Sequence, residues 1–113
     1  MDSQLQLNEE RMKILAKFRQ ALPDLAANES ARTSLAYRDG ALSTKVKRLI
    51  ALAIAVRAGC TNPILAQTMR ALEAGATKDE ILETLSVNAT LSGTTGIGES
   101  LRVIKLLDEL GKL

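Results

Sequence analysis

The chain has 113 residues, a length that fits one domain. Its 15 basic and 13 acidic residues give a net charge of +2, no basic run is present, and aromatic residues make up only 2% of the chain. We therefore expect no nucleic-acid partner, because phosphate-binding stripes and stacking rings are both missing. The hydrophobic fraction of 46% is enough for a core, which must consist mainly of small aliphatic side chains and so favours a helical bundle.

Helix signals divide the first half of the chain into three segments. The first predicted helix covers residues 8–22, whose apolar residues recur at helical spacing and include Met12, which we expect in the core. A weaker helix is expected over 28–37 and a third over 44–58. The third helix is apolar on every face between residues 49 and 56, so we expect it to be buried all round, at the domain centre or partly in a subunit interface.

Three more helices are expected in the second half. Asn62 is predicted to cap the fourth, which runs to residue 74 with Pro63 at its first position, where a missing N–H costs nothing. Thr77 and Glu80 have the spacing of a capping box at the start of the fifth. A glycine-rich turn precedes the sixth helix and contains Gly93, Gly96 and Gly98. The sequence thus predicts an all-α fold of about six helices, with the third and fourth as a central antiparallel pair.

Cysteine and histidine usage limits the chemistry. The chain has one cysteine, Cys60, and no histidine. A single cysteine cannot form an internal disulfide, so an oxidising compartment is not implied. The longest apolar run, residues 49–56, is far shorter than the roughly 20 residues that span a bilayer. The charged N-terminal region does not have the pattern of a signal peptide. We expect a cytoplasmic protein with no cofactor, no metal and no membrane partner.

Cys60 directly precedes a predicted helix, where free backbone N–H groups and the helix dipole stabilise a thiolate. However, no imidazole exists to take the proton of the thiol or to act as the base of a triad. Two interpretations of Cys60 stay open. It is either a small structural residue or a redox-sensitive thiol.

The segment from Leu42 to Cys60 resembles the carboxymuconolactone decarboxylase-like family, which includes the alkylhydroperoxidase D-like thiol peroxidases. The likeness continues into residues 73–81 and fades over 88–93. This resemblance implies one family domain over residues 1–113, with its core at about 42–93. It also implies an alkylhydroperoxidase D-like helical bundle that forms a homo-oligomer, either a trimer or a hexamer.

The family's thiol peroxidases share a glutamate, a Cys-x-x-Cys pair and a histidine four residues beyond the second cysteine. The resemblance maps these positions onto Arg48, Cys60, Pro63 and Gln67, so this chain keeps the resolving cysteine without the attacking thiol or its base. Proline has no nucleophile, glutamine cannot take a proton near neutral pH, and arginine cannot replace a carboxylate base. Each residue also has an ordinary alternative, since Gln67 fits a polar helix position and Arg48 fits a surface or interface ion pair.

Three functions remain open from the sequence. The first is an oligomeric binding or scaffold protein with no or weak two-cysteine peroxidase activity. The second is a one-cysteine, thiol-dependent peroxidase, in which Cys60 is oxidised to a sulfenic acid and then reduced by an external thiol. The third is a different small-molecule enzyme that uses the same pocket. If the chain is an enzyme, we expect an oxidoreductase rather than a lactone decarboxylase, because the resemblance places a histidine in the decarboxylases.

Overall fold

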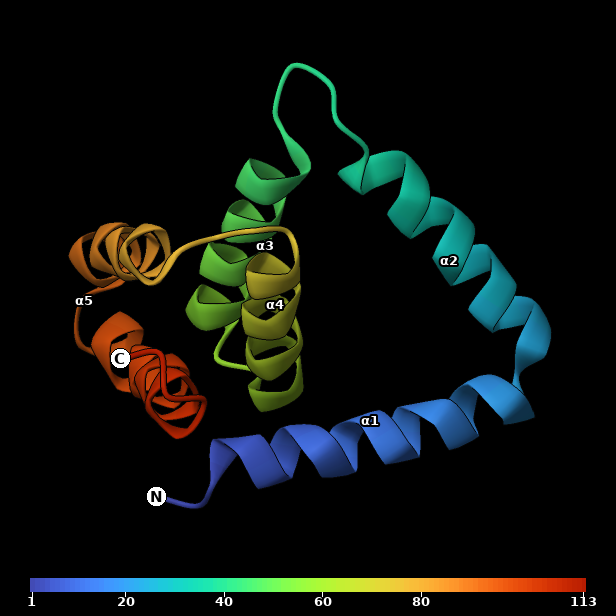
Figure 1. The fold of residues 1–113 in the computed structure, drawn as a ribbon, viewed down its shortest axis with the longest axis horizontal. Coiled ribbons are helices and arrows are strands. Elements are labelled where there is room, and N and C mark those ends of the chain that lie inside the picture. Colours follow the sequence, from blue (N-terminus) through green and yellow to red (C-terminus); the bar gives the residue numbers. More distant parts are fainter.

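The computed structural model describes all 113 residues and contains five helices and no strands (Figure 1). α3 and α4 lie side by side at the centre, and α5 packs against both of them. α1 crosses one end of this pair, and α2 then turns back toward the start of α3, so that α1 and α2 form a bent arm. The helices are α1 (Gln4–Ala21), α2 (Pro23–Tyr37), α3 (Thr44–Ala58), α4 (Thr61–Glu73) and α5 (Lys78–Glu109). The predicted all-α fold is confirmed, and none of the five helices combines the length and hydrophobicity needed to cross a membrane.

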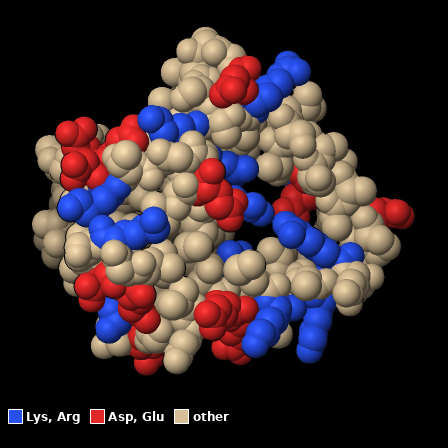
Figure 2. Space-filling model, in the orientation of Figure 1, with Lys and Arg blue, Asp and Glu red and all other residues tan.

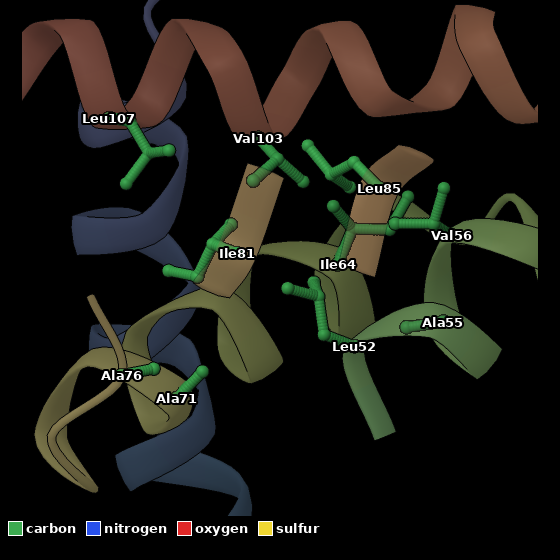
Figure 3. Close-up of a cluster of buried hydrophobic side chains, with 10 residues drawn as sticks. All are labelled: Leu52, Ala55, Val56, Ile64, Ala71, Ala76, Ile81, Leu85, Val103 and Leu107. Atoms are coloured by element: carbon green, nitrogen blue, oxygen red, sulfur yellow. The ribbon is translucent and has the colours of Figure 1, made fainter. Parts of the chain in front are cut away.

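The core lies where α3, α4 and α5 meet, and it is entirely aliphatic (Figure 3). Short side chains let the three helices approach closely, and burying them supplies most of the favourable free energy of folding. Neither aromatic residue of the chain belongs to this cluster. Its ten members are Leu52, Ala55, Val56, Ile64, Ala71, Ala76, Ile81, Leu85, Val103 and Leu107.

α5 is bent rather than straight, because Gly93 has non-helical dihedral angles, with φ 64° and ψ −143°. Its two parts, orange and red in Figure 1, therefore run in different directions. Five helices are observed where about six were predicted. The turn expected before the sixth helix is reduced to one non-helical residue, Gly93, so the fifth and sixth predicted helices are the two parts of α5. Gly96 is helical and tightly packed, and a Cβ atom there would lie 2.9 Å from the carbonyl oxygen of Asn88.

Two local predictions were wrong. Asn62 does not cap α4, because the helix starts at Thr61 with Cys60 at the N-cap position, and Pro63 is its third residue. All of the first positions of a helix tolerate proline, since their N–H groups have no acceptor within the helix, so Pro63 did not locate the start. Met12 is exposed rather than part of the core, because α1 packs on the other helices mainly through its first two turns, where Gln4 and Asn8 are buried.

α3 is not buried all round within one chain. One face enters the core, while another carries three apolar side chains spaced four residues apart and exposed to solvent. The most exposed of them is Ile54, at 64% of its full surface. We call this row the α3 stripe, and it consists of Val46, Ile50 and Ile54.

The two ends of the chain are joined at the start of α1. The carboxylate of Glu109 accepts hydrogen bonds from the backbone N–H of Gln4 at 2.8 Å, the backbone N–H of Leu5 at 3.4 Å and the hydroxyl of Ser3. These bonds, with that of Ser3 the largest contribution, hold the pKa of Glu109 below its ordinary value. A carboxylate from the last turn of α5 thus satisfies the free N–H groups of α1 and fixes where the arm leaves the core.

Gly93 and Gly98 provide a matched pair for testing the bend in α5. Alanine at Gly93 must adopt dihedral angles that only glycine visits readily, so Gly93→Ala should lower the free energy of unfolding by about 1–3 kcal/mol. Gly98 is helical and has open space around it, so Gly98→Ala should raise that free energy by about 0.5–1 kcal/mol. Urea denaturation followed by far-UV circular dichroism measures both. Effects of the same sign in the two variants would contradict the bend.

Candidate functional site

A cavity of about 1050 Å³ lies between the arm and the core, lined by α1, α2, α3 and α4. This volume is just above the range of about 300–1,000 Å³ that is usual for small-molecule sites. Figure 2 shows the hollow between the core and α2, with basic side chains in blue and acidic ones in red at its edge. The hollow exists because the arm contacts the core near its two ends and leaves its middle apart.

Arg48 connects three helices at one wall of the cavity. Its guanidinium carbon lies 3.5 Å from the centre of the Tyr37 ring at the end of α2, which is the geometry of a cation–π contact. Its Nη1 donates a hydrogen bond of 3.4 Å to Oε1 of Gln67 on α4. Arg48 takes part in none of the four ion pairs of the chain, so the salt-bridge role considered from the sequence is not seen within one chain.

Three of the four positions singled out by the family resemblance line the cavity together, namely Arg48, Pro63 and Gln67. Cys60 does not line it. The thiol is exposed at the start of α4, and Sγ makes one weak contact of 3.9 Å with the carbonyl oxygen of Ala58. The cavity therefore contains no thiol and no imidazole, and its polar lining groups are hydroxyls, amides, guanidinium groups and the carboxylates of Glu10 and Glu29.

Sequence reasoning did not single out three further arginines of the lining, Arg11, Arg19 and Arg70. The pKa of Arg11 depends in part on the other two arginines. Burial, followed by repulsion from the guanidinium groups of Arg70 and Arg19, lowers the pKa of Arg11 from its ordinary value. Arg11 and Arg19 lie on the weakly amphipathic α1, where the sequence shows only a charged helix surface. The fold of the arm is what turns that surface toward the cavity.

Comparisons with known proteins agree with the fold. The sequence profile of the carboxymuconolactone decarboxylase family matches residues 25–106. An uncharacterised protein of Cupriavidus necator, H16_B0147, is 36% identical over 75 residues, and the match covers 66% of each chain, just under two thirds.

Solved structures extend the likeness to the whole chain. The apo form of lpg0406 from Legionella pneumophila, a carboxymuconolactone decarboxylase family protein, is 30% identical with a TM-score of 0.88, over 99% of this chain and 100% of that one. TM1620 from Thermotoga maritima is 26% identical with a TM-score of 0.77, over 91% and 90% of the two chains. In a further structure, TM1620 is described as a carboxymuconolactone decarboxylase family protein possibly involved in antioxidative response. That structure is 25% identical to this chain with a TM-score of 0.73, over 91% of this chain and 87% of that one.

The contact between Arg48 and Tyr37 predicts how the arm is held. Arg48→Ala removes the cation–π contact, which is worth about 0.5–2 kcal/mol, so backbone amides of α2 should exchange their hydrogens faster while those of α5 stay unchanged. Hydrogen–deuterium exchange with mass spectrometry measures this by segment. Arg57→Ala, at an exposed position of α3 outside the cavity, is the matched control. Unchanged exchange in α2 of the Arg48 variant would show that other contacts hold the arm.

Proposed function

Since the chain belongs to the carboxymuconolactone decarboxylase family, we propose that it is an oligomeric member that binds a small molecule in the arm–core cavity and lacks two-cysteine peroxidase chemistry. One observation carries the proposal. Arg48, Pro63 and Gln67 line one cavity, and Cys60 lies outside that lining. These are the positions at which the resemblance places a carboxylate, an attacking thiol and its base.

The missing groups account for most of what peroxide reduction needs. An attacking thiolate must reach the peroxide oxygen, and a positioned proton acceptor is worth about 10²–10⁴ in rate. The amide of Gln67 cannot fill that role, and its oxygen accepts a hydrogen bond from Arg48. Cys60 alone cannot form the internal disulfide that closes a two-cysteine cycle. We also propose that the protein is cytoplasmic, since a reducing compartment suits a single cysteine without a partner.

A one-cysteine peroxidase is the second candidate, favoured by the exposure of Cys60 at the start of α4. In that reaction the thiolate attacks the hydroperoxide, the O–O bond breaks, and a sulfenic acid and an alcohol form after one proton is taken up. Two external thiols then return the sulfenic acid to the thiol and release water and a disulfide. The possible antioxidative part of TM1620 is a reason to test this chemistry here. A different enzyme in the same cavity remains the third candidate.

The peroxidase assay separates these candidates. Turnover of cumene hydroperoxide with dihydrolipoamide as the reductant should be at background level for the wild-type protein. Pro63→Cys with Gln67→His should raise turnover, and adding Arg48→Glu should raise it further. The reason is that Arg48 contacts Gln67 at 3.4 Å, so it would lower the pKa of a histidine placed there and weaken it as a base. Consumption of hydroperoxide over time is the measurement.

Cys60→Ser is the control, both in the wild-type protein and in the triple variant with Arg48→Glu, Pro63→Cys and Gln67→His. In the triple variant it should abolish the gained turnover, because the resolving thiol is removed. Robust wild-type turnover that Cys60→Ser abolishes would instead establish the one-cysteine mechanism. Robust wild-type turnover that survives Cys60→Ser would show that another site does the chemistry. Either result would overturn the proposed function.

The exposed apolar surface supports the oligomer, a trimer or hexamer by the family resemblance. α2 buries none of its residues within one chain, and the α3 stripe lies open. A second apolar surface on α5 includes Val87 and Leu91, the latter 85% exposed. Soluble monomers rarely leave such surfaces uncovered, and a second copy of the chain can cover them with the same kind of surface.

Light scattering tests the oligomer. The wild-type protein should have three or six times the 12.1 kDa mass of one chain at micromolar concentration. Ile54→Glu puts a charge into the α3 stripe and should lower the mass, while Arg57→Glu, one turn away and already exposed at a polar position, should leave it unchanged. A wild-type mass equal to one chain would remove the oligomer from the proposal.

A further inference from the structure

The only two aromatic residues of the chain, Phe18 and Tyr37, both line the arm–core cavity. Phe18 is 44% exposed within the chain, so it contributes little to the core. Three aliphatic side chains of α1 continue the apolar wall, and hydroxyl groups of α2 face the same space. A cavity with one apolar wall and several polar groups suits a ligand with an apolar body and a polar end. The aliphatic side chains are Leu7, Ile14 and Leu15, and the hydroxyl residues are Ser30, Thr33 and Ser34.

The charged residues of the lining give the cavity an excess of positive charge. Four arginines face two glutamates, Glu10 and Glu29. Two of the arginines have carboxylate partners, since Arg19 pairs with Glu29 at 3.3 Å and Arg70 pairs with Glu73 at 3.0 Å. The remaining two, Arg11 and Arg48, have none.

Arg11 has donors left for a ligand. Its Nε donates to Oδ1 of Asn8 at 3.0 Å, a neutral acceptor that leaves the charge uncompensated, and both of its Nη groups are without a protein acceptor. Burial, followed by the guanidinium groups of Arg70 and Arg19, opposes protonation of Arg11 and lowers its pKa. Arg19 and Arg70 have carboxylate partners, whereas Arg11 has none, so the charge of Arg11 is the one left for a ligand to balance. The first residues of α4, Thr61 and Asn62, lie on the same lining, and a helix N-terminus adds to the positive potential.

We propose that the cavity binds a small organic anion, with its carboxylate or phosphate head group on Arg11 and its apolar body along α1 beside Phe18. Arg48 extends the positive wall and contributes a weaker, longer-range attraction. This inference rests on the proposed function, because it names the ligand class for the same cavity. Planar guanidinium groups bind carboxylate and phosphate oxygens in pairs, which makes Arg11 the residue that selects the charged end.

Oligomerisation does not need to close the cavity. The α3 stripe and the residues Val87 and Leu91, which we expect a second copy to cover, are all absent from the lining. The α3 stripe therefore lies on a different face of α3 from Arg48, and the surface of Val87 and Leu91 lies on α5, which does not line the cavity. The apolar residues of α1 lie within the lining of the hollow between arm and core, a space of a size that suits a small ligand.

Three probes of equal chain length, octanoate, octyl phosphate and octanol, test the inference. Titration calorimetry of the wild-type oligomer should show binding of octanoate and octyl phosphate, and octanol at least ten-fold weaker, because only the charged head groups engage Arg11. The ratio of the two anions tells whether a carboxylate or a phosphate is preferred. Aromatic proton NMR signals come only from Phe18 and Tyr37, so their shifts on addition of octanoate locate the ligand in this cavity.

Arginine variants identify the contact. Arg11→Gln should weaken octanoate binding by about ten-fold or more, and Arg11→Lys, which keeps the charge, by about three-fold. Arg32→Gln, at an exposed position of α2 outside the lining, should leave the affinity unchanged. Circular dichroism checks that each variant is folded, and the comparison of octanoate with octanol on the wild-type protein does not depend on any variant.

Three results would overturn the inference. They are no octanoate binding, octanol binding as tightly as octanoate, or equal losses in the Arg11 and Arg32 variants. Each would leave the proposed function in place if hydroperoxide turnover is also absent. Conversely, robust hydroperoxide turnover alongside Arg11-dependent octanoate binding would remove the proposed function and keep the anion site.

Discussion

Gly59 lets the chain reverse direction between α3 and α4, and most of the structure depends on this reversal. Its φ of 73° is readily adopted only by glycine, and its N–H closes the last turn of α3 by donating to the carbonyl oxygens of Ala55 and Val56 at 3.0 and 3.2 Å. The two helices then pack directly on each other and offer α5 one continuous aliphatic surface. The same reversal brings Arg48 on α3 within hydrogen-bonding distance of Gln67 on α4, although 19 residues separate them.

The arm is held differently, because it has almost no apolar core of its own. At one end, Glu109 binds the free N–H groups that begin α1, and at the other end Tyr37 stacks on Arg48. Between these points α2 buries no side chain. Polar contacts at two ends and few apolar contacts between them leave a hollow, so the cavity follows from how the arm is attached. A better-packed α2 would have filled it.

Local signals predicted the parts of this structure that local chemistry determines. The capping box of Thr77 and Glu80 is present as expected, with hydrogen bonds of 2.9 and 3.1 Å, and an all-α fold followed from the helical periodicity. Signals shared by several positions were less informative, as with Pro63, which suits any early position of a helix. The exposure of Met12 and the alignment of Arg11 with the cavity depend on the direction of the arm, which is set by contacts between residues about a hundred positions apart. No short sequence pattern encodes those contacts.

The substitutions at the family positions make physical sense together. A carboxylate, a thiol and an imidazole in one cavity can exchange protons and electrons, whereas Arg48, Pro63 and Gln67 can do neither at neutral pH. At the positions that the resemblance maps, this wall carries the permanent positive charge of Arg48 and no group that titrates near neutral pH. Arg11, Arg19 and Arg70 strengthen this positive character from α1 and α4. Retaining such charge in a partly buried space is costly unless an anion balances it. On the proposed function, the four guanidinium groups of the lining hold a ligand that the cavity has no thiol or imidazole to transform.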